Sequence, residues 1–306
     1  MKKVQINILF FFALLVGLMS CLKKDSMNID PDSDPKNVVE FANSGDNLAT
    51  AASKYPRFYF DLGTVTLNQA VTVKINVGYS GAESASQDIS VNLAFDTAAL
   101  SLYNNTDGTD YIVPPTSIFK LPMSAVIKKG TRLAQVEMTV TVNSDFDFNK
   151  SYAVPLKITS ASTGTISNNF GSAIFSFGGR NKYDGIYKVK GKATHSENAS
   201  YTGPFVDPEV EFTTTGSASV QIESQPVFNL STGALSALAS YPVFTVNADN
   251  SVTVTNMNAG GMAPSVSDPT YKNRYDPATK TFYISYSYNA SKPRIFYDTC
   301  IYVKPR

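Results

Sequence analysis

The chain has 306 residues, and its charge is nearly balanced, with 26 lysines and arginines against 25 aspartates and glutamates. This length favours about two domains, and the absence of a basic excess leaves no electrostatic basis for binding nucleic acid. Charged residues make up only 17% of the chain, below the ~25% of average soluble proteins, and with the many tyrosines and phenylalanines this composition is typical of exported β-rich proteins.

The first twenty residues have the layout of a secretory signal peptide. Lys2 and Lys3 form a basic start, and an apolar run from Val4 to Met19 is too short to span a bilayer comfortably. The run ends in LMSC, which resembles a bacterial lipobox, in which the thiol of Cys21 is acylated and becomes the mature N-terminus. The competing interpretation is an ordinary signal peptide with an incidental cysteine. We predict a signal peptide over 1–20 and lipidation at Cys21.

Residues 21–45 are predicted to be a lipidated flexible tether, because they are rich in Asp, Asn, Ser and Pro and hold little to bury. The segment DPDSD at 30–34 lacks the glycine and the terminal glutamate of a calcium loop, so we expect no metal there.

Apolar and polar residues alternate through residues 46–179, which predicts antiparallel strands. In one run, Val71, Val73, Ile75 and Val77 share a face. Two packed sheets bury such faces, so we predict an immunoglobulin-like β-sandwich of about seven strands. A short helical turn is expected near 97–102. The predicted strands are 57–62, 70–79, 88–96, 133–142, 152–160 and 172–178.

The alternation is interrupted near 178–185 by paired glycines and polar residues, so we place a domain boundary there and assign 180–306 to a second domain. Two hairpins are predicted in it, with turns at NADNS and at DPATK, where Pro277 suits the second position of a type I turn. The opening YDGIYKVKG resembles the first strand of lipocalin-like barrels. The predicted fold class is therefore all-β, ending in an antiparallel β-barrel or sandwich of open topology.

These features together resemble a known family. The lipobox, the Asp-rich tether, DYIVPPTSIFKLP (110–122) and YAVPLKITS (152–160) are similar to the N-terminal sandwich domain of Bacteroidetes surface lipoproteins of unknown function. NRYDPATKTFYISYSYN and RIFYDTCIYV are similar to the C-terminal β-domain often paired with it. Such proteins are typically encoded in polysaccharide-utilisation loci beside outer-membrane transporters. The resemblance implies an outer-membrane location facing the cell surface and a role near glycan capture, and it transfers no binding residues.

Two short triplets are consistent with that origin. DSM at 25–27 and DTA at 96–98 resemble the Asp-(Ser/Thr)-apolar acceptor used for O-glycosylation of exported proteins in this phylum. They predict glycans on Ser26 and Thr97, although triplets this short also arise by chance.

The residues that catalysis and metal binding need are scarce. Cys21 and Cys300 are the only cysteines and His195 is the only histidine, so we expect a buried strand residue at Cys300, a solvent-facing His195, no metal site and no cofactor. Paired carboxylates are the remaining route to an enzyme, a glycoside hydrolase. Glu209 and Glu211 share one strand face, which more often marks a solvated surface. We predict that the protein is not an enzyme.

Sugar binding is the favoured chemistry, because sugar rings stack their C–H faces on aromatic rings while amides, carboxylates and Arg bond the hydroxyls. The second domain concentrates such groups around one predicted hairpin, where Tyr283, Ser285 and Ser287 are expected to form an exposed face. Tyrosines are also good strand formers, and the chain has no tryptophan, so a structural role is the alternative. The predicted ligand-binding residues are Tyr271, Arg274, Tyr275, Tyr283 and Tyr286.

The predicted function is a non-catalytic, lipid-anchored surface lipoprotein that binds glycan or supports a polysaccharide-uptake complex. Its expected partners are a glycan ligand or an outer-membrane transporter complex, and it contacts the membrane only through its lipid. The alternative is an adhesion or structural envelope protein that binds another protein, and a glycoside hydrolase is less favoured.

Overall fold

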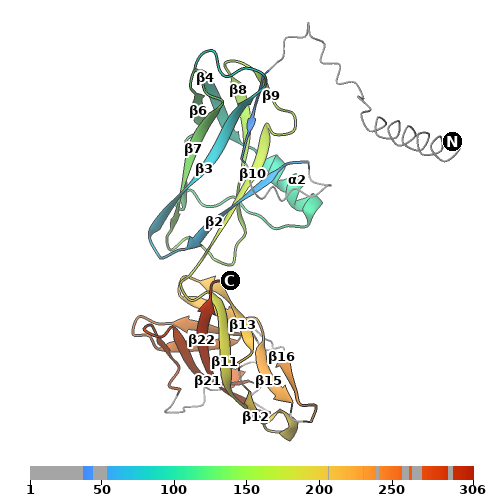
Figure 1. Cartoon of the computed structure of the whole chain (residues 1–306), viewed down its shortest axis with the longest axis vertical. Coiled ribbons are helices and arrows are strands. Elements are labelled where there is room, and N and C mark those ends of the chain that lie inside the picture. The colour runs from blue at the N-terminus through green and yellow to red at the C-terminus, as the bar shows by residue number, and fades with distance from the viewer. Residues whose placement is uncertain are drawn as a thin grey trace, which may run out of the picture.

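The chain is almost entirely β and forms two domains, one after the other along the sequence (Figure 1). The predicted signal peptide, Cys21 and Ser26 lie outside the residues that the structure describes. Within the described ranges there is no helix long and apolar enough to cross a membrane. This computed structural model describes residues 37–43, 54–205, 207–229, 231–238, 241–256, 262–263, 271–288 and 292–306.

Two five-stranded sheets form the N-terminal domain, with strand orders β5-β7-β3-β1-β9 and β2-β10-β8-β4-β6. The predicted sandwich and all six predicted strands are confirmed, but the described part of the domain has ten strands instead of about seven, and two of the pairings, β2 with β10 and β1 with β9, are parallel instead of antiparallel. The strands are β1 (Val38–Phe41), β2 (Arg57–Thr64), β3 (Gln69–Ser80), β4 (Ile89–Phe95), β5 (Phe119–Lys120), β6 (Ser124–Ile127), β7 (Leu133–Val142), β8 (Tyr152–Ala161), β9 (Thr165–Ile166) and β10 (Ser172–Arg180).

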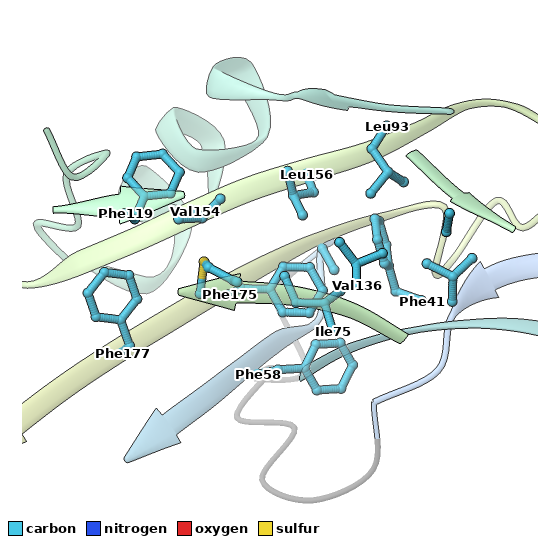
Figure 2. Close-up of a cluster of buried hydrophobic side chains, with 14 of the residues drawn as sticks. Phe41, Phe58, Ile75, Leu93, Phe119, Val136, Val154, Leu156, Phe175 and Phe177 are labelled. Carbon is cyan, nitrogen blue, oxygen red and sulfur yellow. The ribbon is translucent and has the colours of Figure 1, made fainter. Parts of the chain in front are cut away.

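The side chains that alternate inward from both sheets fill one core (Figure 2). Phe175 lies at its centre, with its ring centroid 5.2 Å from that of Phe41 in the facing sheet and 5.6 Å from that of Phe58 on the neighbouring strand. Full burial of each such side chain contributes about 1.5–3 kcal/mol to stability. The period-two pattern in the sequence therefore translates directly into the two-layer packing.

Two further expectations for the N-terminal domain need correction. The predicted tether over 21–45 is too long, because Val38–Phe41 form β1, which pairs with β3 and buries Val39 and Phe41. The expected short turn near 97–102 is an 11-residue helix, α2 (Thr97–Asp107). Asp96 accepts a hydrogen bond from the Ala99 backbone N–H at its start, and Gly108 ends it in the left-handed conformation, so the helix has a cap at each end.

One large antiparallel sheet forms most of the C-terminal domain, in the order β18-β17-β14-β13-β11-β22-β21-β19. β12 adds to β11, β20 adds to β21, and β15 and β16 form a separate hairpin. Its strands are β11 (Gly185–His195), β12 (Gly203–Phe205), β13 (Glu209–Gly216), β14 (Ser219–Ile222), β15 (Gln225–Asn229), β16 (Ala234–Leu238), β17 (Pro242–Val246), β18 (Val252–Asn256), β19 (Met262–Ala263), β20 (Arg274–Asp276), β21 (Thr281–Tyr288) and β22 (Arg294–Lys304), and a 3-10 turn spans Ala199–Tyr201.

The ends of this sheet approach one another, so that it is barrel-like and nearly closed. Ser251, next to β18, forms an isolated bridge with Arg274 of β20, and the Tyr275 backbone N–H donates to the carbonyl oxygen of Asn250 at 2.8 Å. Both predicted hairpins are confirmed, since β17 pairs with β18 and β20 with β21 around the expected turns. The ring of Phe282 lies inside, among other aromatic rings.

A short segment, Asn181–Asp184, leads from the last strand of the first domain into the second and is held by hydrogen bonds. The buried Asn181 amide donates to the carbonyl oxygens of Gly216 and Ser219, each at 2.7 Å, and accepts from the Tyr183 N–H. Asp184 accepts from both the backbone N–H and the hydroxyl of Thr214 at 2.8 Å. The connection is therefore fixed to the second domain.

Candidate functional site

The register of four neighbouring strands brings tyrosines and cations together on the outer side of the C-terminal sheet. Lys192 of β11 is paired with Tyr297 of β22. Two residues further along β22, on the same face, Thr299 is paired with Tyr283 of β21, which is in turn paired with Arg274 of β20. Residues paired in this way have neighbouring side chains on one face. We call the set Tyr271, Arg274, Tyr283, Tyr297 and Lys192 the outer face.

One end of the outer face is a stacked pair. The guanidinium carbon of Arg274 lies 4.0 Å from the ring centroid of Tyr283, and both side chains are half-buried. A guanidinium is planar and weakly hydrated, so it stacks well on an aromatic face while its N–H groups still point outward as donors. Tyr283 is therefore oriented by Arg274, which occupies one side of its ring.

The other end of the outer face is centred on Tyr297. Its ring centroid is 5.5 Å from that of Tyr271, at an interplanar angle of 52°, and the ammonium of Lys192 lies 4.6 Å from it. Tyr297 is half-buried and Lys192 is exposed. Two aromatic rings and one cationic donor thus meet at a single point on the sheet surface.

The serines beside Tyr283 were expected to be exposed, but both are buried. Ser285 is 1% exposed and Ser287 is 2% exposed. The side-chain oxygen of Asn273 accepts a hydrogen bond from the Ser285 backbone N–H at 2.6 Å, which places the turn Tyr271–Asn273 over this part of β21. The exposed face that was predicted for Tyr283, Ser285 and Ser287 is therefore reduced to Tyr283. The same turn supplies Tyr271 to the outer face.

Two of the five predicted ligand-binding residues point inward instead. Tyr286 is fully buried, and its hydroxyl donates to the side-chain oxygen of Gln225, so its assignment to a surface site is wrong. Tyr275 is only 6% exposed and packs edge-on against Tyr183 at 4.9 Å; its burial raises its pKa to about 12. The reason is strand alternation, because outward Arg274 and Tyr283 leave Tyr275 and Tyr286 on the inner side.

Sequence reasoning missed Tyr297 and Lys192. Both lie in alternating runs that carry a detectable signal. In YKVKGK, three lysines alternate with inward residues. In RIFYDTCIYV, Tyr297 lies in a run where every second residue is buried, from Phe296 to Cys300. What the pattern does not contain is the pairing of β11 with β22, which alone brings Lys192 to Tyr297.

The groups that catalysis would need are held in structural roles. His195 is half-buried rather than solvent-facing: its Nδ1 accepts from the backbone N–H groups of Glu197 and Asn198, and its Nε2 lies 2.8 Å from Nε of Arg294. Burial and the charge of Arg294 lower the pKa of His195. Cys300 is fully buried, as expected, and burial raises the pKa of its thiol.

Carboxylates are dispersed over the described part of the chain. Glu209 is exposed and is paired across the strands with Lys188, and Glu211 is half-buried. In the described residues no group of three or more His, Cys, Asp or Glu side chains is placed to hold a metal ion. The outer face therefore offers stacking surfaces and hydrogen-bond donors, which suit binding. Thr97 is exposed at the first position of α2, and its glycosylation stays a prediction.

Family comparisons match both domains. A family model described as an N-terminal domain matches residues 41–165, and a second, described as a C-terminal domain, matches residues 171–300. None of the curated proteins has a matching sequence.

Solved structures from Bacteroides share the fold at low sequence identity. A protein of unknown function from Bacteroides ovatus is 15% identical, with a TM-score of 0.58, and covers 88% of this chain and 95% of its own. A multidomain protein including DUF1735 from the same species is 16% identical, with a TM-score of 0.50, over 86% of this chain and 92% of its own. An auxiliary nutrient binding protein from Bacteroides thetaiotaomicron is 12% identical, with a TM-score of 0.46, over 85% and 94%. At these identities the first two likenesses show the fold alone, and the third, with a TM-score under 0.5, carries no argument.

Proposed function

The chain belongs to a family of two-domain Bacteroidetes proteins of unknown function, and we propose that it is a non-catalytic glycan-binding protein anchored by lipid to the outer membrane. The outer face is the observation that carries this proposal. It gathers three tyrosine rings and two cations from four strands and a turn into one surface.

The chemistry of the outer face matches the two demands of a sugar. Tyr297 and Tyr271 offer aromatic surface to the apolar C–H side of a pyranose ring. Arg274 and Lys192 supply N–H donors beside those rings, and neither carries an acceptor, so they suit hydroxyl and ring oxygens. A guanidinium held against Tyr283 also loses little freedom when it binds a ligand, which reduces the entropic cost of association.

A purely structural role for these tyrosines explains less. Inward tyrosines such as Tyr187 and Tyr286 are fully buried and hydrogen-bonded within the domain. Tyr283 and Tyr297 lie instead on the opposite side of the same sheet, half-buried and each beside a cation. Surface aromatic rings with adjacent donors are the arrangement that recognition uses.

The proposed location rests on the sequence of the first residues. A lipid on Cys21 after removal of residues 1–20 would hold the two β-domains at the cell surface. A glycan bound there would be presented to an outer-membrane transporter, which is the partner we propose. The membrane contact would then be through the lipid alone.

Affinity gel electrophoresis tests the glycan-binding proposal. The chain without residues 1–20 is run through gels that contain neutral polysaccharides, beside a gel without polysaccharide. Retarded migration in at least one polysaccharide gel is expected, whereas equal migration in every gel contradicts the proposal. Mass spectrometry of the protein from its own membrane tests the anchor, with a diacylglyceryl-modified Cys21 as the expected N-terminus and an unmodified thiol as the contrary result.

A further inference from the structure

A cavity of about 380 Å³ lies at the junction of the two domains, where the C-terminus of the chain is marked in Figure 1. This volume is within the roughly 300–1,000 Å³ of small-molecule sites. Both domains line it: Thr64 belongs to the first, Arg180 to its last strand, and Tyr275, Lys280, Tyr302 and Arg306 to the second. The cavity is distinct from the outer face, although Tyr275 was predicted as a ligand contact and lines it.

Positive charge dominates the lining. The lining has four cationic side chains and one acidic side chain, Asp184; the cations are Arg180, Lys182, Lys280 and Arg306. Asp184 is 8% exposed and is already bonded by the guanidinium of Arg306, whose Nε lies 3.3 Å from its Oδ1. The cavity therefore has more cations than its one acidic side chain neutralises.

The two arginines are also committed to protein partners. Arg180 donates to the carboxylate of Asp61 at 2.6 Å and to the backbone oxygen of Arg306, the last residue of the sequence, at 2.7 Å. Arg306 is in turn bonded to Asp184. These contacts fix the wall between the domains and leave the two lysines as the cations available to a ligand.

Lys182 and Lys280 lie against aromatic rings instead of carboxylates. The ammonium of Lys182 is 5.1 Å from the ring centroid of Tyr183, and that of Lys280 is 4.7 Å from that of Tyr302. Both lysines are exposed, and in the described part of the chain neither has a carboxylate within 4.0 Å. Their charges are positioned by the rings but are not neutralised.

The aromatic part of the lining is neutral and suits a sugar ring. Tyr302 packs edge-on against Tyr187, with 5.5 Å between ring centroids, and Tyr275 packs against Tyr183. Burial raises the pKa of both Tyr275 and Tyr302. Both hydroxyls are therefore neutral near neutral pH, and neither repels an anion. Pro277 and Pro305 add further apolar lining.

We infer that the junction cavity binds an anionic sugar residue, one that carries a carboxylate or a sulfate ester, with Lys182 and Lys280 holding the charge and Tyr302 contacting the ring. The inference rests on the proposed glycan binding and names its ligand class. Lys280 directly precedes β21, and Tyr283 lies three residues along the same strand, which is about 10 Å at the rise of an extended chain. The two sites are therefore close along β21 but are separate subsites, because residues three apart on a strand lie on opposite faces.

Isothermal titration calorimetry with small sugars tests the inference on the chain without residues 1–20. Galacturonate supplies the carboxylate, galactose 6-sulfate supplies the sulfate ester, and galactose is the neutral control. The double variant Lys182→Gln, Lys280→Gln is compared with Lys120→Gln, Lys129→Gln, which removes the same charge from exposed positions of the N-terminal domain. Thermal unfolding of both variants confirms that each is folded.

We expect at least one anionic sugar to bind at least tenfold more tightly than galactose, more weakly as salt is raised, and at least tenfold more weakly to the Lys182/Lys280 variant. The control variant is expected to stay within twofold of the unmodified chain. Equal binding of charged and neutral sugars, no binding of either anion, or equal loss in both variants overturns the inference.

The two proposals fail separately. Neutral polysaccharide that still retards the chain, while the anions do not bind, refutes the anionic subsite and leaves the proposed function standing. Binding of an anionic sugar that is lost in the Lys182/Lys280 variant, without retention by any polysaccharide, supports the cavity and refutes the proposed polysaccharide binding.

Discussion

The guanidinium of Arg274 lies over the ring of Tyr283, 4.0 Å from its centroid, and this pair joins two strands, β20 and β21, on the outer face. Arg274 is also the residue through which β20 approaches β18 in the bridge with Ser251. The side chain of Arg274 therefore shapes the proposed binding surface, while its backbone helps to close the sheet.

Replacing Arg274 by Ala is expected to weaken binding of a retained polysaccharide about tenfold, because the variant loses both the donor and the ring orientation. The stability cost is smaller, about 0.5–1 kcal/mol for a partly exposed cation–π pair. Affinity gels and urea unfolding measure the two effects. Lys54→Ala is the matched control, since Lys54 lies 5.4 Å over the Tyr55 ring in the other domain; equal binding losses in the two variants would contradict the assignment.

Asp298 makes the stability of the C-terminal domain depend on pH. It is fully buried, neither of its carboxyl oxygens has a hydrogen-bond partner among the described residues, and burial raises its pKa to about 8, partly opposed by the nearby amide of Gln225. Because the folded pKa exceeds the unfolded value of about 3.9, this contribution to stability is complete below pH ~4 and is lost as the pH rises toward 8.

Over that interval the free energy of unfolding should fall by about 1.4 kcal/mol per pH unit from this group alone. Asp298→Asn removes the titration, so its stability should vary less with pH and exceed that of the unmodified chain near pH 8. Urea unfolding at pH 5 and pH 8 measures the difference. Asp88→Asn, at an exposed carboxylate bonded to Lys128, is the control; identical pH slopes in all three proteins would show that Asp298 is charged when folded.

The substitution Tyr286→Phe tests whether Tyr286 stabilises the core or contributes to binding at the surface. The substitution leaves the buried side-chain oxygen of Gln225 without the hydroxyl that bonds it, which costs about 1–3 kcal/mol. Polysaccharide retention should not change, because Tyr286 does not reach the outer face. Tyr283→Phe is the comparison, with little expected loss of stability. A loss of retention on Tyr286→Phe, with stability unchanged, would restore Tyr286 to the binding site.

Asn181→Ala tests whether the connection between the domains is fixed by hydrogen bonds. The side chain of Asn181 bonds two carbonyl oxygens, those of Gly216 and Ser219, and its loss should destabilise the C-terminal domain by about 1–3 kcal/mol. The control Asn92→Ala removes an exposed hydrogen bond to Ser160 and should change stability by less than about 0.5 kcal/mol. Urea unfolding followed by tyrosine fluorescence gives both values, and equal changes would argue against a fixed connection.

The fold was largely predictable from the sequence, because a period of two residues identifies strands wherever one face is buried. All six strands predicted in the first domain and both hairpins in the second are present. β1 was missed because four residues, Val38–Phe41, are too few for a periodic signal, and their pairing with β3 spans a distance of about 40 residues in sequence. Helix α2 was underestimated because its amphipathic pattern is weak.

The candidate site was predicted only in part. The hairpin that carries Arg274 and Tyr283 was identified from its turn residues. The abundance of tyrosine in this hairpin also led to the assignment of Tyr275 and Tyr286 to the binding site, although the strand alternation directs both inward. Tyr297 was missed because its partner Lys192 is more than 100 residues away in sequence and is brought to it only by sheet pairing. Which strands are neighbours is a tertiary property that local patterns do not contain.

The most direct test of glycan recognition by the outer face is the retention of Tyr297→Ala in an affinity gel containing a polysaccharide that retards the unmodified chain. The control is Tyr59→Ala, at an exposed tyrosine of the N-terminal domain. We predict that Tyr297→Ala loses most of its retention while Tyr59→Ala keeps it. Retention of Tyr297→Ala equal to that of the unmodified chain, with the variant folded, would contradict the account.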